Sequence, residues 1–129
     1  MASAAAITPI GEIPALVASV RAAYASGATL PYSWRAAQLS AIIRLLEENR
    51  PAIHAALAAD LHKPLFEADI NEIEVVVQEA RHALSHLASW MAPQAVPTPL
   101  MHLPASASMR REPLGVALLI LPWNFPFCA

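Results

Sequence analysis

An unbroken apolar run near the end of the sequence constrains the fold most strongly. Residues 114–121 are apolar apart from Gly115, and Pro113 and Pro122 bound them on either side. A short apolar run that contains β-branched residues and ends at prolines predicts a strand buried on both faces, as in parallel sheets. The run is too short to cross a bilayer as a helix. We therefore expect a sheet to begin at this point in the chain.

The residues directly after the run place one polar amide, Asn124, among aromatic side chains. Ligands of open α/β sheets bind outside the carboxyl ends of the strands, so Asn124 would lie at such a site. A side-chain amide donates two hydrogen bonds without carrying charge, which suits stabilisation of an oxyanion. An Asx turn after a strand explains the same residue. The residues alone favour the turn and indicate no reaction.

Composition and charge narrow the class of protein. The chain is 57% hydrophobic and 14% charged, with much alanine, which is typical of a helix-rich chain rather than a disordered one. A net charge of -2 gives no electrostatic reason to expect nucleic acid or an anionic membrane as partner. The one cysteine, Cys128, excludes internal disulfides and favours a reducing, cytoplasmic location. The Ala- and Ser-rich start is also compatible with a short organelle-targeting segment.

Helical periodicity dominates the first two thirds of the chain. The pattern predicts a helix over residues 14–26 with Gly27 as its left-handed end, a second from the N-cap Ser33 to Glu48, and a third from Pro51 to Lys63. The third ends there because the residue before Pro64 is disfavoured in helical angles. A fourth helix over residues 67–91 carries an apolar stripe at spacings of three and four: Ile70, Ile73, Val77, Ala80, Leu84, Leu87 and Met91. Its width favours packing within a domain over a coiled coil.

Prolines divide the remainder of the chain. Those at positions 93, 97, 99 and 104 predict an extended, helix-free connector, and residues 106–112 have the character of a short exposed strand. We therefore expect a helical section over residues 1–92, a proline-rich connector over 93–105 and the start of an α/β domain over 106–129. On this division the chain is mostly α, with the first strands of a sheet at its end.

The histidines do not predict a metal site. His82 and His86 have the spacing of two zinc ligands on one helix, but Ala83 stands where the metalloprotease pattern needs glutamate. No cysteine or third histidine is placed to complete a ligand set. Polar histidines near the end of a helix explain the pair.

Other candidate groups also have simpler explanations. Cys128 has no assignable general base and is interpreted as a small hydrophobic residue. Glu72 and Glu74 are two positions apart and cannot share a helix face as an acid–base pair. The three glycines are scattered, so the chain has neither a P-loop nor the dinucleotide-binding fingerprint.

The segment EPLGVALLILPWNFPF, residues 112–127, closely resembles the start of the nucleotide-binding domain in the aldehyde dehydrogenase superfamily. The predicted helical sequence from Arg21 onward resembles the N-terminal helices of the class 3 branch, whose substrates are fatty and aromatic aldehydes. The segment TPLMHLPASASMRREPLGV, residues 98–116, resembles the connector of the same branch. The resemblance extends over nearly all of the chain from about Val17 and implies an α/β, aldehyde dehydrogenase-like fold.

The resemblance implies oxidation of a small-molecule aldehyde to a carboxylic acid with NAD or NADP. In the family, a cysteine thiolate attacks the aldehyde to give a thiohemiacetal, a hydride passes to the nicotinamide, and a glutamate base assists hydrolysis of the thioester. The family's oxyanion-stabilising asparagine falls on Asn124. Ile120, Leu121, Pro122 and Trp123 match the segment that lines the cofactor.

The family's nucleophile and base match no position up to Ala129, and Cys128 is not the nucleophile position. The resemblance therefore implies an N-terminal portion of such an enzyme, inactive alone, whose full-length relatives are homodimers. No transmembrane segment is expected in this chain. The alternative function is a non-catalytic helical interaction module that binds a partner through the apolar stripe from Ile70 to Met91.

Overall fold

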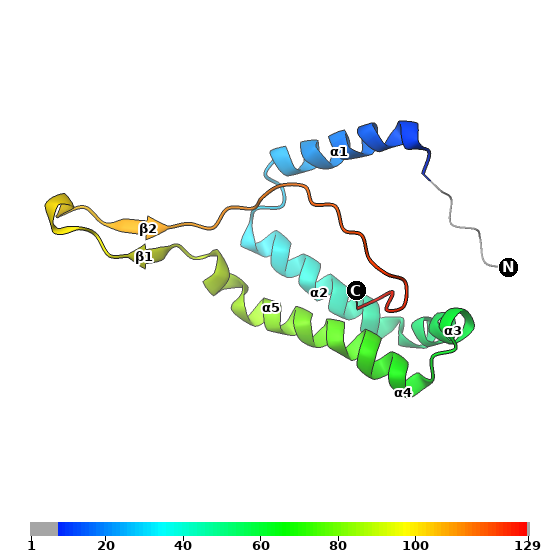
Figure 1. Ribbon diagram of the computed structural model, residues 1–129. Coiled ribbons are helices and arrows are strands. Elements are labelled where there is room, and N and C mark those ends of the chain that lie inside the picture. Colours follow the sequence, from blue (N-terminus) through cyan, green and yellow to red (C-terminus); the bar gives the residue numbers. More distant parts are fainter. Residues whose placement is uncertain (1–7, 129) are drawn as a thin grey trace.

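A computed structural model describes residues 8–128 and shows a chain that is mostly helical (Figure 1). The helices are α1 (Ile13–Ala25), α2 (Tyr32–Glu48), α3 (Arg50–Leu61), α4 (Leu65–Ala68) and α5 (Val75–Met91), and a π-helical segment, η2 (Asp69–Glu74), joins the last two. Two short strands follow, β1 (Gln94–Val96) and β2 (Ala107–Met109). This mostly helical chain with a small sheet confirms the predicted fold class. The start of the chain, which is compatible with organelle targeting, includes residues 1–7, and these lie outside the described residues.

The first two helices agree with the sequence prediction except at one cap. Gly27 follows α1 with a φ of 74°, in the left-handed region that favours glycine at a helix end. The prediction of Ser33 as the N-cap of α2 is wrong, because the cap position is Pro31 and Ser33 lies inside the first turn. The pyrrolidine ring holds Pro31 at a φ of -61°, so the helix begins two residues earlier than the serine signal indicated.

The third predicted helix also ends earlier than proposed. Helix α3 ends at Leu61, and His62 closes it in the left-handed conformation with a φ of 54°. The backbone N–H of Lys63 donates to the carbonyl of Leu57 at 3.3 Å, which completes the turn. The physical stop is therefore the left-handed His62, and Pro64 only prevents the helix from resuming before Leu65.

The predicted fourth helix is one continuous helical stretch with a change of pitch. Helix α4 begins at Leu65, and the π-helical segment η2 separates it from α5, which ends at Met91 as predicted. Within η2, Glu72 and Ile73 are both fully buried. A π-helical segment shifts the angular position of side chains relative to a regular helix, so it rotates Glu72 onto the buried side.

The core lies where α2, α3 and the α4–η2–α5 stretch meet. Helices α2 and α5 lie side by side in opposite directions, as Figure 1 shows. The core cluster consists of Leu46, Ile53, Leu57, Ala68, Ile73 and Val77. Along the stripe from Ile70 to Met91, four of the apolar residues are buried, and α5 packs against α2 of the same chain. The surface that an interaction module would need is therefore largely occupied from within.

The connector contains more regular structure than predicted. Strands β1 and β2 pair in antiparallel register, with Gln94 opposite Met109 and Val96 opposite Ala107. The strand expected over residues 106–112 is thus confirmed in a shorter form, whereas β1 was not predicted. The expectation of a helix-free connector is wrong at one turn of 3-10 helix, Leu100–His102. The hairpin extends away from the helices (Figure 1). No described helix is long and apolar enough to span a membrane.

The prediction of a buried strand over residues 114–121 is wrong for the described chain. Residues 110–122 form no regular strand, and most of the apolar side chains of this run are exposed, Ile120 to 85%. A parallel strand needs neighbours on both edges and helices on both faces. Residues 8–128 provide only the β1–β2 pair as a sheet, so nothing pairs with or covers the run.

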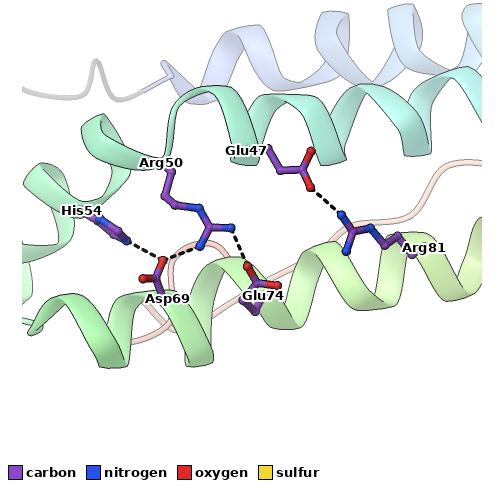
Figure 2. A network of polar contacts seen from close by, with 6 residues as sticks. All are labelled: Glu47, Arg50, His54, Asp69, Glu74 and Arg81. Atoms are coloured by element: carbon purple, nitrogen blue, oxygen red, sulfur yellow. Dashed lines mark hydrogen bonds and ion pairs between the residues drawn. The ribbon is translucent and has the colours of Figure 1, made fainter.

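A polar network ties α3 to η2 beside the core (Figure 2). Arg50 donates to Asp69 Oδ1 at 2.7 Å and to Glu74 Oε1 at 2.6 Å. His54 Nε2 lies 2.8 Å from the same oxygen of Asp69. The hydrogen bond with His54 is the largest effect and lowers the pKa of Asp69 below its ordinary value of 3.8. Desolvation opposes it, and the hydrogen bond with Arg50 lowers the pKa further. The hydrogen bonds to Glu74 and then Asp69 raise the pKa of Arg50.

The core predicts a large difference between two leucine truncations. Leu57 is 2% exposed and Leu45 is 58% exposed, and both lie in helices. Leu57→Ala should lower the free energy of unfolding by about 2–5 kcal/mol, since it leaves a cavity, whereas Leu45→Ala should change it by less than about 0.5 kcal/mol. Chemical denaturation of both variants measures the difference. Equal losses would contradict the assignment of the core.

The polar network predicts a specific acid dependence. The lowered pKa of Asp69 means that its ionised form stabilises the fold above the ordinary value of 3.8, and that this contribution is lost as the pH falls through the lower native pKa. Asp69→Asn should therefore be less stable than the parent near neutral pH, and the difference should shrink below pH 3.8. Denaturation at a series of pH values measures it. Glu48→Gln, at an exposed carboxylate without an ion pair among residues 8–128, serves as control.

Candidate functional site

The end of the described chain folds back onto the helices. From the hairpin it passes beneath α1 (Figure 1) and ends beside α3 and η2. Trp123 and Asn124 form a turn, and the turn structure continues to Cys128. Tyr24 of α1 donates its hydroxyl to the carbonyl of Pro113 at 2.9 Å, which fixes the point where the returning segment begins. The predicted site residues therefore lie on a segment held by contacts distant in sequence.

A buried ion pair lies beneath this turn. Lys63 Nζ donates to Glu72 Oε1, and the two side chains are 9% and 0% exposed. Burying charges is unfavourable unless they are paired and their remaining hydrogen-bonding capacity is used. Glu72 Oε2 meets that requirement, because it accepts the backbone N–H of Phe127 at 3.0 Å and that of Cys128 at 3.3 Å. Removing one partner of such a pair typically costs about 3–5 kcal/mol.

The lysine also holds the turn directly. Lys63 Nζ donates to the backbone carbonyl of Asn124 at 2.8 Å and lies 4.0 Å from the centroid of the Phe125 ring. An ammonium over an aromatic face is attracted by the ring quadrupole. One lysine therefore contacts Glu72, the peptide of Asn124 and the next side chain along.

Asn124 presents its side chain outward. The residue is exposed, and within residues 8–128 its side-chain amide makes no hydrogen bond, while its carbonyl is bound by Lys63. The hydrogen bonds of the described chain thus include none that would make an Asx turn at this position. Two amide N–H donors remain available for an incoming oxygen atom. Chemically, the position can stabilise negative charge on oxygen without adding a positive charge of its own.

The structure brings together only part of the predicted cofactor-lining segment. A groove of about 490 Å³ lies between this turn and α3, lined by Trp123, Pro126, Phe127, Ala56, Leu57, Asp60 and Leu61. Trp123 borders this groove and is 84% exposed, whereas Ile120, Leu121 and Pro122 lie outside its lining. Residues 120–123 form an exposed apolar row. The described residues offer no glycine-rich helix start of the kind that binds the phosphates of a dinucleotide.

Lys63 and Glu72 were missed as site residues. Glu72 was considered only with Glu74 and set aside, and that pair indeed does not act together, since Glu74 bonds Arg50. A signal was present in the sequence. Glu72 directly precedes Ile73 of the apolar stripe and stands four positions before Val76, so its carboxylate lies beside the core face of the helix. A carboxylate there requires a buried cationic or N–H partner.

The histidines and the cysteine have other surroundings. The rings of His82 and His86 stack at 4.2 Å between centroids, and His86 stacks on Trp90. His86 Nδ1 lies 2.9 Å from the carbonyl of His82. No group of three metal-binding side chains occurs in the described part of the chain. Cys128 is an exposed free cysteine whose backbone N–H, rather than its thiol, contacts Glu72.

Comparison with known proteins gives the family. The profile described as "Aldehyde dehydrogenase family" matches residues 3–129. The human aldehyde dehydrogenase family 3 member B1 is 41% identical over 92% of this chain, and aldehyde dehydrogenase family 3 comG of Dictyostelium discoideum is 40% identical over 96%. An aldehyde dehydrogenase of Craterostigma plantagineum is 43% identical over 87% of the chain. The matches cover 25%, 26% and 23% of those proteins, so the chain spans about a quarter of their length.

A solved structure agrees with the sequence matches. The substrate-bound Staphylococcus aureus AldH superposes with a TM-score of 0.82 at 29% identity, over 93% of this chain and 26% of that one. The superposition covers nearly all of this chain. With the profile match over nearly every residue and the family 3 relatives, it shows that this chain belongs to the aldehyde dehydrogenase family and corresponds to the N-terminal part of its class 3 members.

Proposed function

We propose that this chain supplies the oxyanion-stabilising amide of an NAD- or NADP-dependent aldehyde dehydrogenase, which oxidises aldehydes to carboxylic acids. The single observation that carries the proposal is Asn124, an exposed amide without a hydrogen-bond partner among the described residues, on a turn whose backbone Lys63 holds. Family membership supplies the reaction class. Because the chain spans about a quarter of its relatives, the proposed activity is that of the complete protein.

The proposed role of Asn124 follows from the charge that develops during the reaction. When a thiolate adds to an aldehyde, the carbonyl oxygen becomes an alkoxide, and the Asn124 amide donates a hydrogen bond to it. Fixed donors aimed at a developing charge lower the barrier because they need no reorganisation at the moment of reaction. A neutral donor has a further advantage. It stabilises the alkoxide without retaining it, so the later departure of hydride is not opposed.

The proposed cofactor contact is limited to the apolar row. NAD or NADP, when bound, accepts the hydride. Ile120, Leu121, Pro122 and Trp123 would lie against it and exclude water, and exclusion of water strengthens the hydrogen bond of Asn124. The proposal includes the division of the chain made above, in which residues 1–92 support the start of the nucleotide-binding domain at residues 106–129.

The nucleophile and the general base are proposed to come from elsewhere in the complete protein. Cys128 does not match the family's nucleophile position, and Glu72 is engaged by Lys63 and by the backbone N–H groups of Phe127 and Cys128. We therefore expect the 129-residue chain alone to be inactive. By family resemblance, the complete protein is proposed to be a cytoplasmic homodimer.

A chimera tests the role of Asn124. Residues 1–128 of this chain replace the matching segment of human aldehyde dehydrogenase family 3 member B1, and turnover of an aldehyde is followed through formation of reduced cofactor. Asn124→Ala should lower kcat by about 10²–10³-fold, since loss of one oxyanion donor typically costs that much. Asn124→Asp should lower kcat at least as far, because it places negative charge beside the alkoxide.

Gln78→Ala is the matched control, because it removes an exposed side-chain amide from α5 that makes none of the described hydrogen bonds to the turn. It should leave kcat within about twofold of the parent chimera, as expected of a surface substitution. If Asn124→Ala retained the activity of Gln78→Ala, the proposed role of Asn124 would be wrong. Turnover by the isolated 129-residue chain would contradict the division of catalytic groups.

A further inference from the structure

We propose that Lys63 and Glu72 are positioning residues for Asn124, in that their buried ion pair fastens the turn over residues 124–128 and so sets where the Asn124 amide points. This inference rests on the proposed function, because it needs Asn124 as the oxyanion donor. Neither residue touches the reacting atoms in this proposal. Both act through the backbone of the turn.

The ion pair holds the turn at both of its ends. At the first end, Lys63 Nζ binds the carbonyl of Asn124 itself at 2.8 Å and covers the ring of Phe125. At the second end, Glu72 Oε2 accepts the N–H groups of Phe127 and Cys128. Because one end of the pair holds the peptide of Asn124 and the other holds the residues that follow, the orientation of the Asn124 Cα–Cβ bond is fixed from two sides.

Few other hydrogen bonds restrain this segment. Among the described residues, the hydrogen bonds that reach residues 114–128 come from Lys63 and Glu72 alone. The nearest polar contact before them is that of Tyr24 with Pro113. Residues 110–122 have no strand partner in the described chain. The position of Asn124 therefore depends on the ion pair more than on local secondary structure.

The local fold is arranged to deliver both charges to one place. Left-handed His62 turns the chain at the end of α3, and Lys63 follows it directly. The π-helical segment η2 carries Glu72 to the buried side. Such π segments occur frequently at functional sites. Since a lysine ammonium has three N–H donors, Lys63 can donate to Glu72 and to Asn124 at the same time.

Hydrogen exchange in the 129-residue chain tests the geometry. The amide protons of Phe127 and Cys128 should exchange about tenfold more slowly than those of Leu118 and Leu119, which have no partner among the described residues. Glu72→Gln should remove most of that protection while the core amide of Val77 keeps its own. Glu47→Gln is the matched control, because it makes the same chemical change in the exposed ion pair with Arg81; it should leave Phe127 and Cys128 unchanged.

Turnover in the chimera tests the positioning role. Glu72→Gln should lower kcat about tenfold or more with KM for the aldehyde nearly unchanged, because misplacement of a catalytic group lowers the rate of chemistry. In an Asn124→Ala background, Glu72→Gln should lower kcat by less than about twofold further, since the two act as one unit. Lys63→Met should behave like Glu72→Gln, and Lys63→Arg, which keeps the charge and donors, should recover most of the loss.

The outcomes separate this inference from the function on which it rests. If Asn124→Ala leaves kcat unchanged, the proposed function fails, and hydrogen exchange still decides whether the ion pair holds the turn. If Asn124→Ala lowers kcat and Glu72→Gln lowers kcat by the same factor in the Asn124→Ala background as in the parent, the positioning role is overturned. Should Glu72→Gln fail to fold, the parent chain decides: exchange of Phe127 and Cys128 as fast as that of Leu118 would refute the contact.

Discussion

The placement of the turn over residues 124–128 against the helices depends on one buried ion pair. Lys63 and Glu72 leave water together, and each must use its remaining hydrogen-bonding capacity inside the protein, since an unpaired buried charge is strongly unfavourable. The partners available are the peptide groups of Asn124, Phe127 and Cys128. Because both charges need partners, they bind residues 124–128, which lie more than fifty positions away in sequence. Electrostatics here links the helical section to the candidate site.

The helices make this link possible because their packing sets the positions of Lys63 and Glu72. The core packs α3 against η2 and α5 through Ile53, Leu57, Ile73 and Val77. Beside that core, Arg50 joins α3 to η2 through Asp69 and Glu74 (Figure 2). Apolar burial supplies most of the stability, whereas the partly exposed ion pairs add little and chiefly set the relative position of the two elements. The distance between Lys63 and Glu72 is therefore determined by packing.

The apolar run over residues 114–121 shows the limit of a pattern. Its hydrophobicity correctly indicates a segment suited to burial, but a strand exists only where neighbouring strands accept its backbone hydrogen bonds. Within residues 8–128 no strand pairs with the run, which is irregular and mostly exposed. The short hairpin was half predicted for the same reason. The strand character of β2 is local, but β1 forms only because the chain over residues 97–106 turns back and brings β2 beside it.

The sequence by itself determined the helices, most of the core stripe over residues 70–91 and the family, because helical periodicity is local and the motif around Asn124 is highly specific. It also identified Asn124, though on its residues alone a turn seemed the better explanation. Only the tertiary structure decided what holds that amide. In the sequence, Glu72 was considered only as an acid two positions from Glu74, and Lys63 only as the residue before a proline. Their pairing requires a π-helical segment, a left-handed His62 and a chain that returns to them. Such a contact depends on three-dimensional packing, which no local pattern records.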